Sequence, residues 1–280
     1  MKLEIAINKA FKELKKNNIK TAMLDSELLM SKVINKNREF IILNLKSEIN
    51  EKDYHYFQKL IYERSKGKPI AYLTNKKFFW KYEFDIIENV LIPRPDTEII
   101  IEQVLNIYKN KNKINFLDIG TGSGCILISI LKERKDFLAT GIDISDDALR
   151  ICKINAYKLG VKNRVKLFKS DIDNFSNGKY DLIISNPPYI KNLDLKYLEK
   201  DVINFEPKLA LNGGLDGITK IRKVINKSAE LIKKNGKLIL EIAFNQKEKV
   251  RQLLKNNGFY VNMVIKDFAK NDRCIVSTKK

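Results

Sequence analysis

The chain has 280 residues, more than one average domain of about 100–200 residues, and it has no apolar run near 18 residues, so neither a membrane span nor a signal peptide is expected. A formal net charge of +19 points to a polyanionic partner, but only 9 of 53 basic residues are arginine and the lysines are scattered, as AT-rich codon drift also produces. The single histidine, His55, lies in a polar helical stretch, which excludes a histidine-based triad and most histidine-rich metal sites, so no metal is expected.

The first part of the chain carries helical periodicity. Apolar residues recur at helical spacing over 3–14, 24–33 and 54–61, and Gly67-Lys68-Pro69 ends the last of these helices. Residues 78–84 predict a short β-hairpin, and 96–108 predict a further helix. We therefore expect a helical domain over 1–68 that recognises the substrate, followed by a hairpin and connecting helix over 69–112.

From residue 113 onwards, strands and helices alternate. This alternation predicts a mostly parallel, doubly wound sheet, and the last two strands predict a C-terminal antiparallel hairpin. The pattern resembles the Rossmann-like α/β fold of class I S-adenosylmethionine-dependent methyltransferases, with 113–280 as the catalytic domain. The expected strands are 114–118, 138–143, 165–169, 180–185, 237–243, 260–266 and 274–278, and the expected helices are 125–132, 146–158, 217–234 and 246–256.

A glycine-rich turn follows the first of these strands, in the order Asp118-Ile-Gly-Thr-Gly-Ser-Gly124. Glycines let the backbone turn tightly against a ligand, and the following helix offers free N–H groups. The spacing differs from the G-x-G-x-x-G of NAD enzymes, which disfavours a dehydrogenase, and it resembles the Asp/Glu-x-Gly-x-Gly motif of S-adenosylmethionine enzymes. That resemblance implies that the loop contacts the methionine part of this cofactor through Gly120, Thr121, Gly122, Ser123 and Gly124.

Acidic residues end the next two strands. Asp143 can accept hydrogen bonds from both hydroxyls of a ribose, a feature shared with NAD folds. Asp171 can accept from an adenine amino group, and Ile172 can pack on the ring. For Asp171 the alternative is a plain turn or helix cap.

The segment Asn186-Pro187-Pro188-Tyr189 ends the fourth strand, at the edge where α/β sheets bind ligands. The Asn186 side-chain oxygen and the Pro187 carbonyl can accept the two hydrogens of a planar N–H2 group. Pro188 stiffens the segment together with Pro187, and the Tyr189 ring can pack on the target and stabilise developing positive charge. A simple Asn-Pro-Pro turn is the alternative. The pattern predicts in-line methyl transfer to a planar nitrogen.

Further segments then narrow the substrate. Residues 67–74, 79–80, 91–98, 201–202 and 205–207, together with the glycine loop and the tetrapeptide, resemble the HemK/PrmC family, the protein-(glutamine-N5) methyltransferases of peptide chain release factors. The match runs over nearly the whole chain. It implies S-adenosyl-L-methionine as cofactor, with Asn186 also at the cofactor. It implies the glutamine of the Gly-Gly-Gln loop of class 1 release factors as substrate.

Some features stay open at this point. Arg94, Glu98 and Glu206 match family positions without clear roles, and the Pro-Arg-Pro segment is either a strap between domains or a cofactor-side element. Asn75 stands where the family commonly has glycine, and because Asn adopts positive φ the turn is expected to survive. The three cysteines fit neither a zinc site nor a disulfide framework, which favours a cytoplasmic protein, and a monomer is expected.

Two rival functions remain. Because adenine N6, guanine N2 and glutamine amides all present an sp2 N–H2, the tetrapeptide alone also suits a DNA or rRNA amino-group methyltransferase, for which nucleic-acid contact is required. A nucleotide-binding protein without catalysis is the other alternative. It predicts that Asn186→Ala leaves the function intact.

Overall fold

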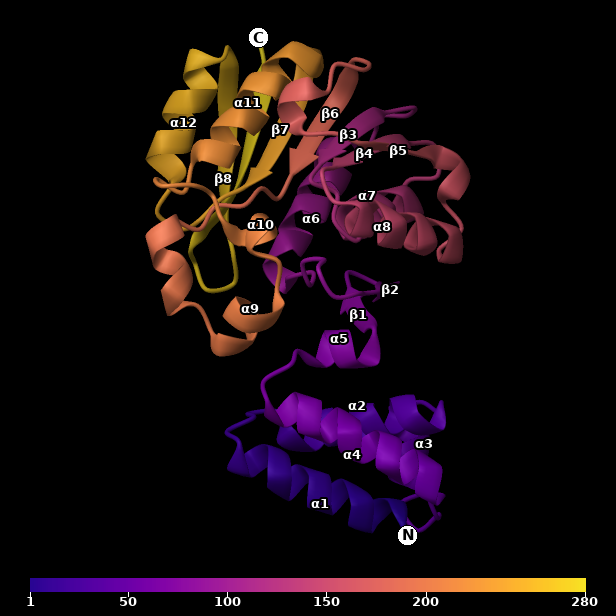
Figure 1. Cartoon of the computed structure of the whole chain (residues 1–280). Helices are drawn as coiled ribbons and strands as arrows, with labels where there is room; N and C mark the ends of the chain where they lie inside the picture. Colours follow the sequence, from indigo (N-terminus) through magenta and orange to yellow (C-terminus); the bar gives the residue numbers. More distant parts are fainter. The chain divides into compact units, whose positions relative to one another are not determined.

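The computed structural model describes residues 1–280. Their contacts divide the chain into a helical unit, Met1–Lys76 with Glu199–Phe205, and a sheet unit, Lys77–Leu198 with Glu206–Lys280 (Figure 1). From Lys77 onwards, the hairpin and connecting helix of 69–112 therefore group with the sheet rather than forming a part of their own.

The helical unit is built around its own apolar core, which includes Leu14, Leu29, Ile41 and Phe57, all nearly inaccessible to solvent. Asn37 and Asn50 each begin a helix by accepting a hydrogen bond from the backbone N–H three residues on. The helices are α1 (Leu3–Lys16), α2 (Ala22–Ile34), α3 (Arg38–Leu43), α4 (Glu51–Ser65), α5 (Ile70–Thr74) and α9 (Lys200–Phe205).

The buried face of α2 differs from the one that hydrophobicity predicted. Leu24 is 40% exposed, whereas Asp25 is buried. The Asp25 carboxylate lies 2.7 Å from the Arg64 guanidinium, so a buried ion pair takes the place of an apolar contact. At the end of α5, Asn75 adopts φ +60°, as predicted for a turn that ordinarily takes glycine.

The sheet unit contains seven strands in the order β5-β4-β3-β6-β7-β9-β8. Strands β3 to β7 pair in parallel, and β9 is antiparallel to both of its neighbours, which confirms the predicted C-terminal hairpin. A separate two-stranded sheet holds β1 (Lys76–Phe79) and β2 (Tyr82–Asp85). The strands of the large sheet are β3 (Asn115–Ile119), β4 (Leu138–Asp143), β5 (Val165–Lys169), β6 (Tyr180–Ser185), β7 (Ile232–Glu241), β8 (Phe259–Lys266) and β9 (Asp272–Lys279).

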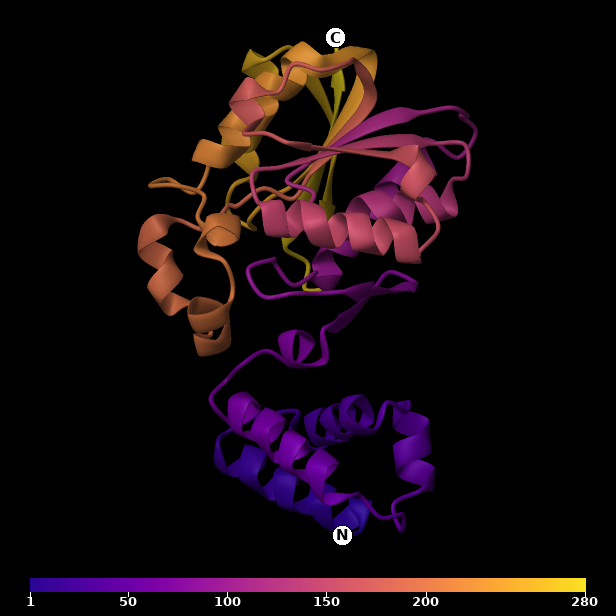
Figure 2. The ribbon, with the colours of Figure 1, turned by 45° about the vertical axis from the view of Figure 1, so that its right-hand side comes forward.

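Helices cover both faces of this sheet, as Figure 2 shows from the side. One face carries α6, α7 and α8, and the other carries α11 and α12. Ser145 starts α8 by accepting from the Ala148 N–H, with two acidic residues in the first turn that suit the positive end of the helix dipole. The helices are α6 (Glu98–Ile107), α7 (Cys125–Glu133), α8 (Asp146–Lys158), α10 (Lys208–Leu211), α11 (Thr219–Leu231) and α12 (Lys247–Asn256).

The strand order positions the functional site. The chain moves from β3 outward through β4 to β5, and then returns to the other side of β3 as β6. Ile119 of β3 pairs with Ile142 on one side and Ser185 on the other. The segments that follow β3, β4 and β6 therefore meet at the switch point of the sheet, where doubly wound folds bind ligands.

Short helices were not anticipated. The helices α5, α9 and α10 and four 3-10 turns have at most six residues each, which is too short to show a periodic pattern. Strand β7 begins at Ile232, five residues before its predicted start at 237, and its pairing with β6 is irregular there. No helix of the structure has the length and apolar character needed to span a membrane.

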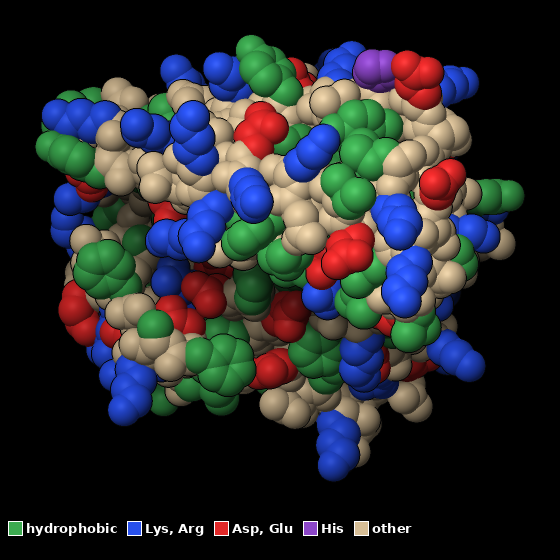
Figure 3. Space-filling view, turned by 90° about the horizontal axis from the view of Figure 1, so that it is seen from below, with side chains coloured by type: hydrophobic (Ala, Val, Ile, Leu, Met, Phe, Trp, Pro, Cys, Tyr) green, Lys and Arg blue, Asp and Glu red, His purple; other side chains and the backbone are tan.

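Basic side chains are spread over the surface. On the face in Figure 3 they alternate with acidic and apolar groups instead of forming one continuous patch. The His55 side chain is 69% exposed and lies 3.7 Å from the Glu51 carboxylate, as expected for a surface residue.

Candidate active site

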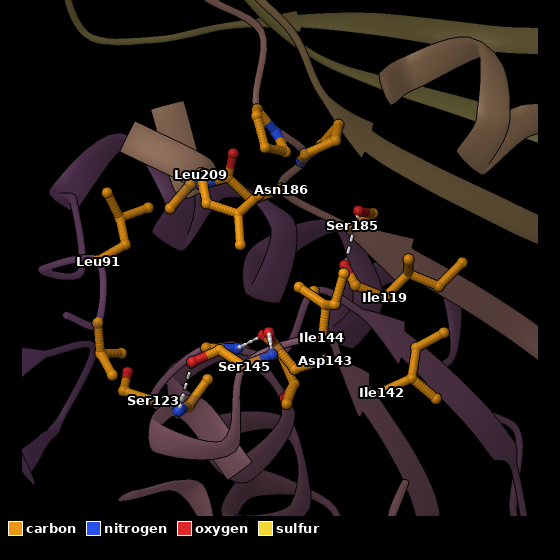
Figure 4. Close-up of a pocket in the computed structure, with 18 of the residues that line it drawn as sticks. Leu91, Ile119, Ser123, Ile142, Asp143, Ile144, Ser145, Ser185, Asn186 and Leu209 are labelled. Atoms are coloured by element: carbon orange, nitrogen blue, oxygen red, sulfur yellow. Dashed lines mark hydrogen bonds between the residues drawn. The ribbon is translucent and has the colours of Figure 1, made fainter. Parts of the chain in front are cut away.

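A cavity of about 230 Å³ lies at the carboxyl edge of the parallel strands within the sheet unit. Asn186 and Leu209 lie on one side of it, across from Asp143 and Ser145 (Figure 4). The walls are mostly apolar with a few polar groups, which is the usual character of a small-molecule site. Its lining includes Leu91, Pro93, Arg94, Thr97, Ile119–Ser123, Cys125, Ile142–Ser145, Ser170–Ile172, Ser185–Pro188, Leu209, Ala210 and Lys220.

The glycine loop needs its glycines for different reasons. Gly120 and Gly122 have φ of +74° and +55°, and a Cβ on either would meet no atom within 4 Å, so they supply backbone freedom beside open space. Gly124 has φ +79°, and a Cβ there would approach Cys152 Sγ to 2.6 Å and Ile128 Cδ1 to 2.8 Å. Gly124 does not line the cavity; it allows α7 to pack closely against α8.

Asp118 supports this loop from below. The side chain is 1% exposed, its Oδ2 accepts a 2.8 Å hydrogen bond from the Thr121 hydroxyl, and its Oδ1 has no partner within the chain. Burial raises the pKa of Asp118 to about 7, although the Thr121 hydrogen bond opposes the rise. Asp118 therefore fixes the loop and does not reach the cavity itself.

Asp143 bridges the glycine loop and the start of α8. Its Oδ2 accepts from the Gly122 N–H and its Oδ1 from the Ser145 N–H, both at 2.9 Å. Burial raises the pKa of Asp143, and these backbone hydrogen bonds oppose the rise. Each oxygen of a carboxylate accepts two hydrogen bonds, so each retains one lone pair for a ligand in the cavity.

Asp171 serves as a cap and also lines the cavity. Its Oδ1 accepts a 3.1 Å hydrogen bond from the Asp173 N–H at the start of the 3-10 turn Ile172–Asn174. Ile172 lines the same part of the cavity and packs against the main core. The cap reading and the ligand reading of Asp171 are therefore compatible.

Asn186 is oriented by a residue from another element. Its Nδ2 donates a 3.0 Å hydrogen bond to the Thr97 hydroxyl oxygen, which comes from the 3-10 turn Pro95–Thr97 before α6. Both residues line the cavity. Neither the Asn186 Oδ1 nor the Pro187 carbonyl accepts a hydrogen bond from the chain.

Tyr189 points away from the cavity lining. Its hydroxyl donates a 3.1 Å hydrogen bond to Glu241 Oε1, its carbonyl accepts from Gln246 Nε2 at 3.0 Å, and its ring packs against the main core. Burial, together with the neighbouring Glu241 carboxylate, raises the pKa of Tyr189, so the hydroxyl keeps its proton.

The Pro-Arg-Pro segment is both strapped down and part of the cavity wall. Arg94 lines the cavity and lies 2.5 Å from the buried Glu206 carboxylate, whose other oxygen accepts from the Ile92 N–H at 3.3 Å. Glu98, at the start of α6, accepts a 2.7 Å hydrogen bond from the Trp80 N–H and so ties the hairpin to the sheet unit.

The structure thus brings the predicted site residues to one cavity, except for Gly124 and Tyr189. Sequence reasoning missed several residues of the same cavity. Thr97 stood inside a segment that had been singled out, so its polar side chain was a usable signal. Leu209, Ala210 and Lys220 come from a distant part of the chain without any motif, and only the fold places them there.

Family comparisons agree with this architecture. Residues 110–277 match the family model described as a methyltransferase domain, and residues 6–74 match the PrmC N-terminal domain. Solved structures of a ribosomal protein L11 methylase from Lactobacillus delbrueckii and a methyltransferase from Pyrococcus furiosus share the fold, with 19% and 18% identity and TM-scores of 0.52 and 0.53. The matches cover 68% and 70% of this chain and 82% and 88% of the solved chains.

Curated relatives extend over both units. The release factor glutamine methyltransferase of Clostridium acetobutylicum is 38% identical over 100% of this chain and 99% of its own length, and that of Buchnera aphidicola from Schizaphis graminum is 36% identical over 100% of both. The bifunctional methyltransferase of Rickettsia conorii is 34% identical over 96% of this chain, which spans only 56% of that longer protein. With such relatives along its full length, this chain belongs to the family of release factor glutamine methyltransferases.

Proposed function

We propose that this protein methylates the side-chain amide nitrogen, N5, of the glutamine in the Gly-Gly-Gln loop of class 1 peptide chain release factors, with S-adenosyl-L-methionine as the methyl donor. The names of the full-length relatives support the substrate. The observation that carries the proposal is the pair of acceptors in the cavity wall, Asn186 Oδ1 and the Pro187 carbonyl, neither of which accepts a hydrogen bond from the chain. A primary amide has two N–H donors in one plane, which suits two adjacent acceptors.

The cavity also fits the proposed cofactor. Positive-φ glycines at 120 and 122 border open space, the Asp143 carboxylate has lone pairs left for ribose hydroxyls, and Ile142 and Ile172 offer apolar surface to an adenine ring. Asp171 lies beside Ile172 as an acceptor for the adenine amino group. When bound, S-adenosylmethionine supplies an electrophilic methyl group on a cationic sulfonium.

The residues of the chain then act by positioning. With both amide hydrogens accepted by Asn186 and Pro187, the glutamine nitrogen is held for in-line transfer. A new C–N bond forms as the C–S bond breaks, and one amide proton is lost to solvent. Alignment of reactants can contribute about 7–11 kcal/mol of barrier reduction. Contact between the Tyr189 ring and the amide stays a prediction, since the hydroxyl of Tyr189 is engaged by Glu241.

The test is mass spectrometry of the Gly-Gly-Gln peptide after incubation of a class 1 release factor with the enzyme and labelled S-adenosylmethionine. We expect one added methyl group on the glutamine. Ribosomal RNA and duplex DNA are offered in parallel, because the net charge of +19 suits a polyanion. Label on nucleic acid with an unmodified release factor would overturn the proposal in favour of a nucleobase amino-methyltransferase.

A further inference from the structure

Glu241, the last residue of β7, is a buried carboxylate outside the cavity lining that connects both ends of the tetrapeptide. It is only 1% exposed, and its Oε1 accepts the 3.1 Å hydrogen bond from the Tyr189 hydroxyl. Thr97, itself 2% exposed, hydrogen-bonds to the same carboxylate and accepts from Asn186 Nδ2. A carboxylate removed from water is costly for a fold, so this arrangement calls for a role.

We propose that Glu241 is a positioning residue: its ionised carboxylate, acting through the Thr97 hydroxyl, holds Asn186 with its side-chain oxygen towards the substrate amide. The inference rests on the proposed function for the identity of that amide. It adds a residue that contacts neither the cavity nor the substrate.

The direction of the hydrogen bonds carries the argument. An ionised carboxylate can only accept, so the Thr97 hydroxyl must give its single proton to Glu241. The Thr97 oxygen is then only an acceptor towards Asn186, and Nδ2 is the only Asn186 side-chain atom that can donate to it. The amide is thereby locked with Oδ1 on the opposite side, as the acceptor that a substrate N–H2 needs.

Protonation of Glu241 removes this lock. A carboxylic acid can donate to the Thr97 oxygen, and the Thr97 proton is then free to turn towards Asn186 Oδ1. The side-chain amide of Asn186 can then reverse and present its own N–H2 to the substrate N–H2, which leaves two donors facing each other. The active state thus requires the ionised form of Glu241.

The surroundings place this titration within the working range of pH. Burial raises the pKa of Glu241 to about 7, against the opposing effects of Thr97, Arg273 and Tyr189, and Asp96 raises it further. Arg273 and Cys274 come from β9, Asp96 from the turn before α6, and Tyr189 from the segment after β6. Burial raises the pKa of Cys274 as well as that of Tyr189, so both stay neutral beside the carboxylate.

The first experiment measures the kinetics of E241Q with release factor and S-adenosylmethionine. Because misplacement of a reacting group can lower the rate about a hundredfold, we expect kcat to fall by about that factor while KM for the release factor changes little. In the wild type, activity rises with pH through about 7, since the ionised form is the active one, and E241Q lacks this acid limb.

Substitutions of Thr97 test the relay itself. T97V removes the hydroxyl at constant shape and is expected to match E241Q, and T97S recovers most of the activity lost in T97V. In the double variant E241Q/T97V the losses do not add, because both changes break one chain of hydrogen bonds. Full additivity, or wild-type kcat and pH profile in E241Q, would overturn the inference.

A matched control separates this role from general stability. Glu133 is a partly buried carboxylate in the same unit that accepts hydrogen bonds from Trp80 and Tyr82, away from the cavity. We expect E133Q to lower Tm without removing the acid limb. S-adenosylmethionine affinity by calorimetry, unchanged in E241Q, shows that the cavity of that variant is still folded.

A readout without any substrate keeps the inference separate from the proposed function. In ¹⁵N-labelled protein, the side-chain N–H2 signals of Asn186, assigned from their loss in N186A, should titrate with an apparent pKa of about 7 and not titrate in E241Q. If that titration is present but the release factor is not methylated, only the proposed function fails. If the release factor is methylated but the signals do not titrate, only the Glu241 inference fails.

Discussion

The two sides of the cavity are built from different materials. The cofactor side, meaning the glycine loop with Asp143 and Asp171, is held by the backbone: Asp143 accepts from two backbone N–H groups and Asp171 from one. The amide side, meaning Asn186, Thr97, Glu241 and Tyr189, is held by side chains from three separate elements. A backbone-built site depends on a few special residues, whereas a side-chain relay depends on each member and on its protonation.

The largest expected effect breaks the amide side alone. Asn186→Ala deletes the acceptor for the substrate amide, and we expect kcat to fall about 10²–10³-fold, the loss typical of removing one oriented polar group from an active site. Affinity for S-adenosylmethionine, measured by calorimetry, should stay within a few-fold of the wild type because the backbone-held side is intact.

If instead N186A abolished cofactor binding, the two sides would form one inseparable site and the comparison would fail. If N186A kept full activity, a role without catalysis, such as nucleotide binding alone, would be favoured. Tm recorded on the same samples shows whether any loss reflects unfolding.

The same contrast explains how far the sequence was informative. Gly120–Gly124, Asp143 and Asn186 each follow directly after a strand, so the rule that ligands bind at the carboxyl edge was sufficient to bring them together. The parallel sheet and its terminal hairpin were predictable for the same reason, since long periodic segments carry their own signal.

The relay was not predictable from local pattern. Glu241 ends a strand of ten residues and is separated from Thr97 by more than half of the chain, so only the order β3-β6-β7 brings them together. Nothing in the segment around Leu209 distinguished it from an ordinary loop. The buried Asp25–Arg64 pair misdirected the burial prediction for α2 in the same way, because the partner of a charge is set by tertiary contact.

The second prediction concerns the stability of the backbone-built side. Gly124→Ala places a Cβ within 2.6 Å of Cys152 Sγ at a φ of +79°. Overpacking and left-handed strain together should lower the free energy of unfolding by about 2–4 kcal/mol, as measured in urea. Gly160→Ala is the matched control, since Gly160 has φ +72° but open space around it.

For Gly160→Ala we expect only the backbone strain, about 1–2 kcal/mol. Equal losses in the two variants would mean that the close approach of α7 and α8 at Gly124 contributes nothing, and that its glycine serves φ alone.

The smallest expected effect breaks the cofactor side alone. Asp143→Asn keeps the shape but replaces one acceptor oxygen by a donor, so hydrogen bonds to ribose hydroxyls and the contact with a backbone N–H both weaken. A hydrogen bond to a charged group contributes about 1.5–3 kcal/mol, so the Kd for S-adenosylmethionine should rise about tenfold to a hundredfold. At saturating cofactor, kcat should remain near that of the wild type, because Asn186 and its relay are untouched. Asp146→Asn is the control: that carboxylate is 77% exposed, pairs with Lys169 and does not line the cavity, so its Kd should not change. A D143N enzyme with unchanged Kd but reduced kcat would reverse the assignment, since it would place Asp143 on the side of the reaction rather than that of the cofactor.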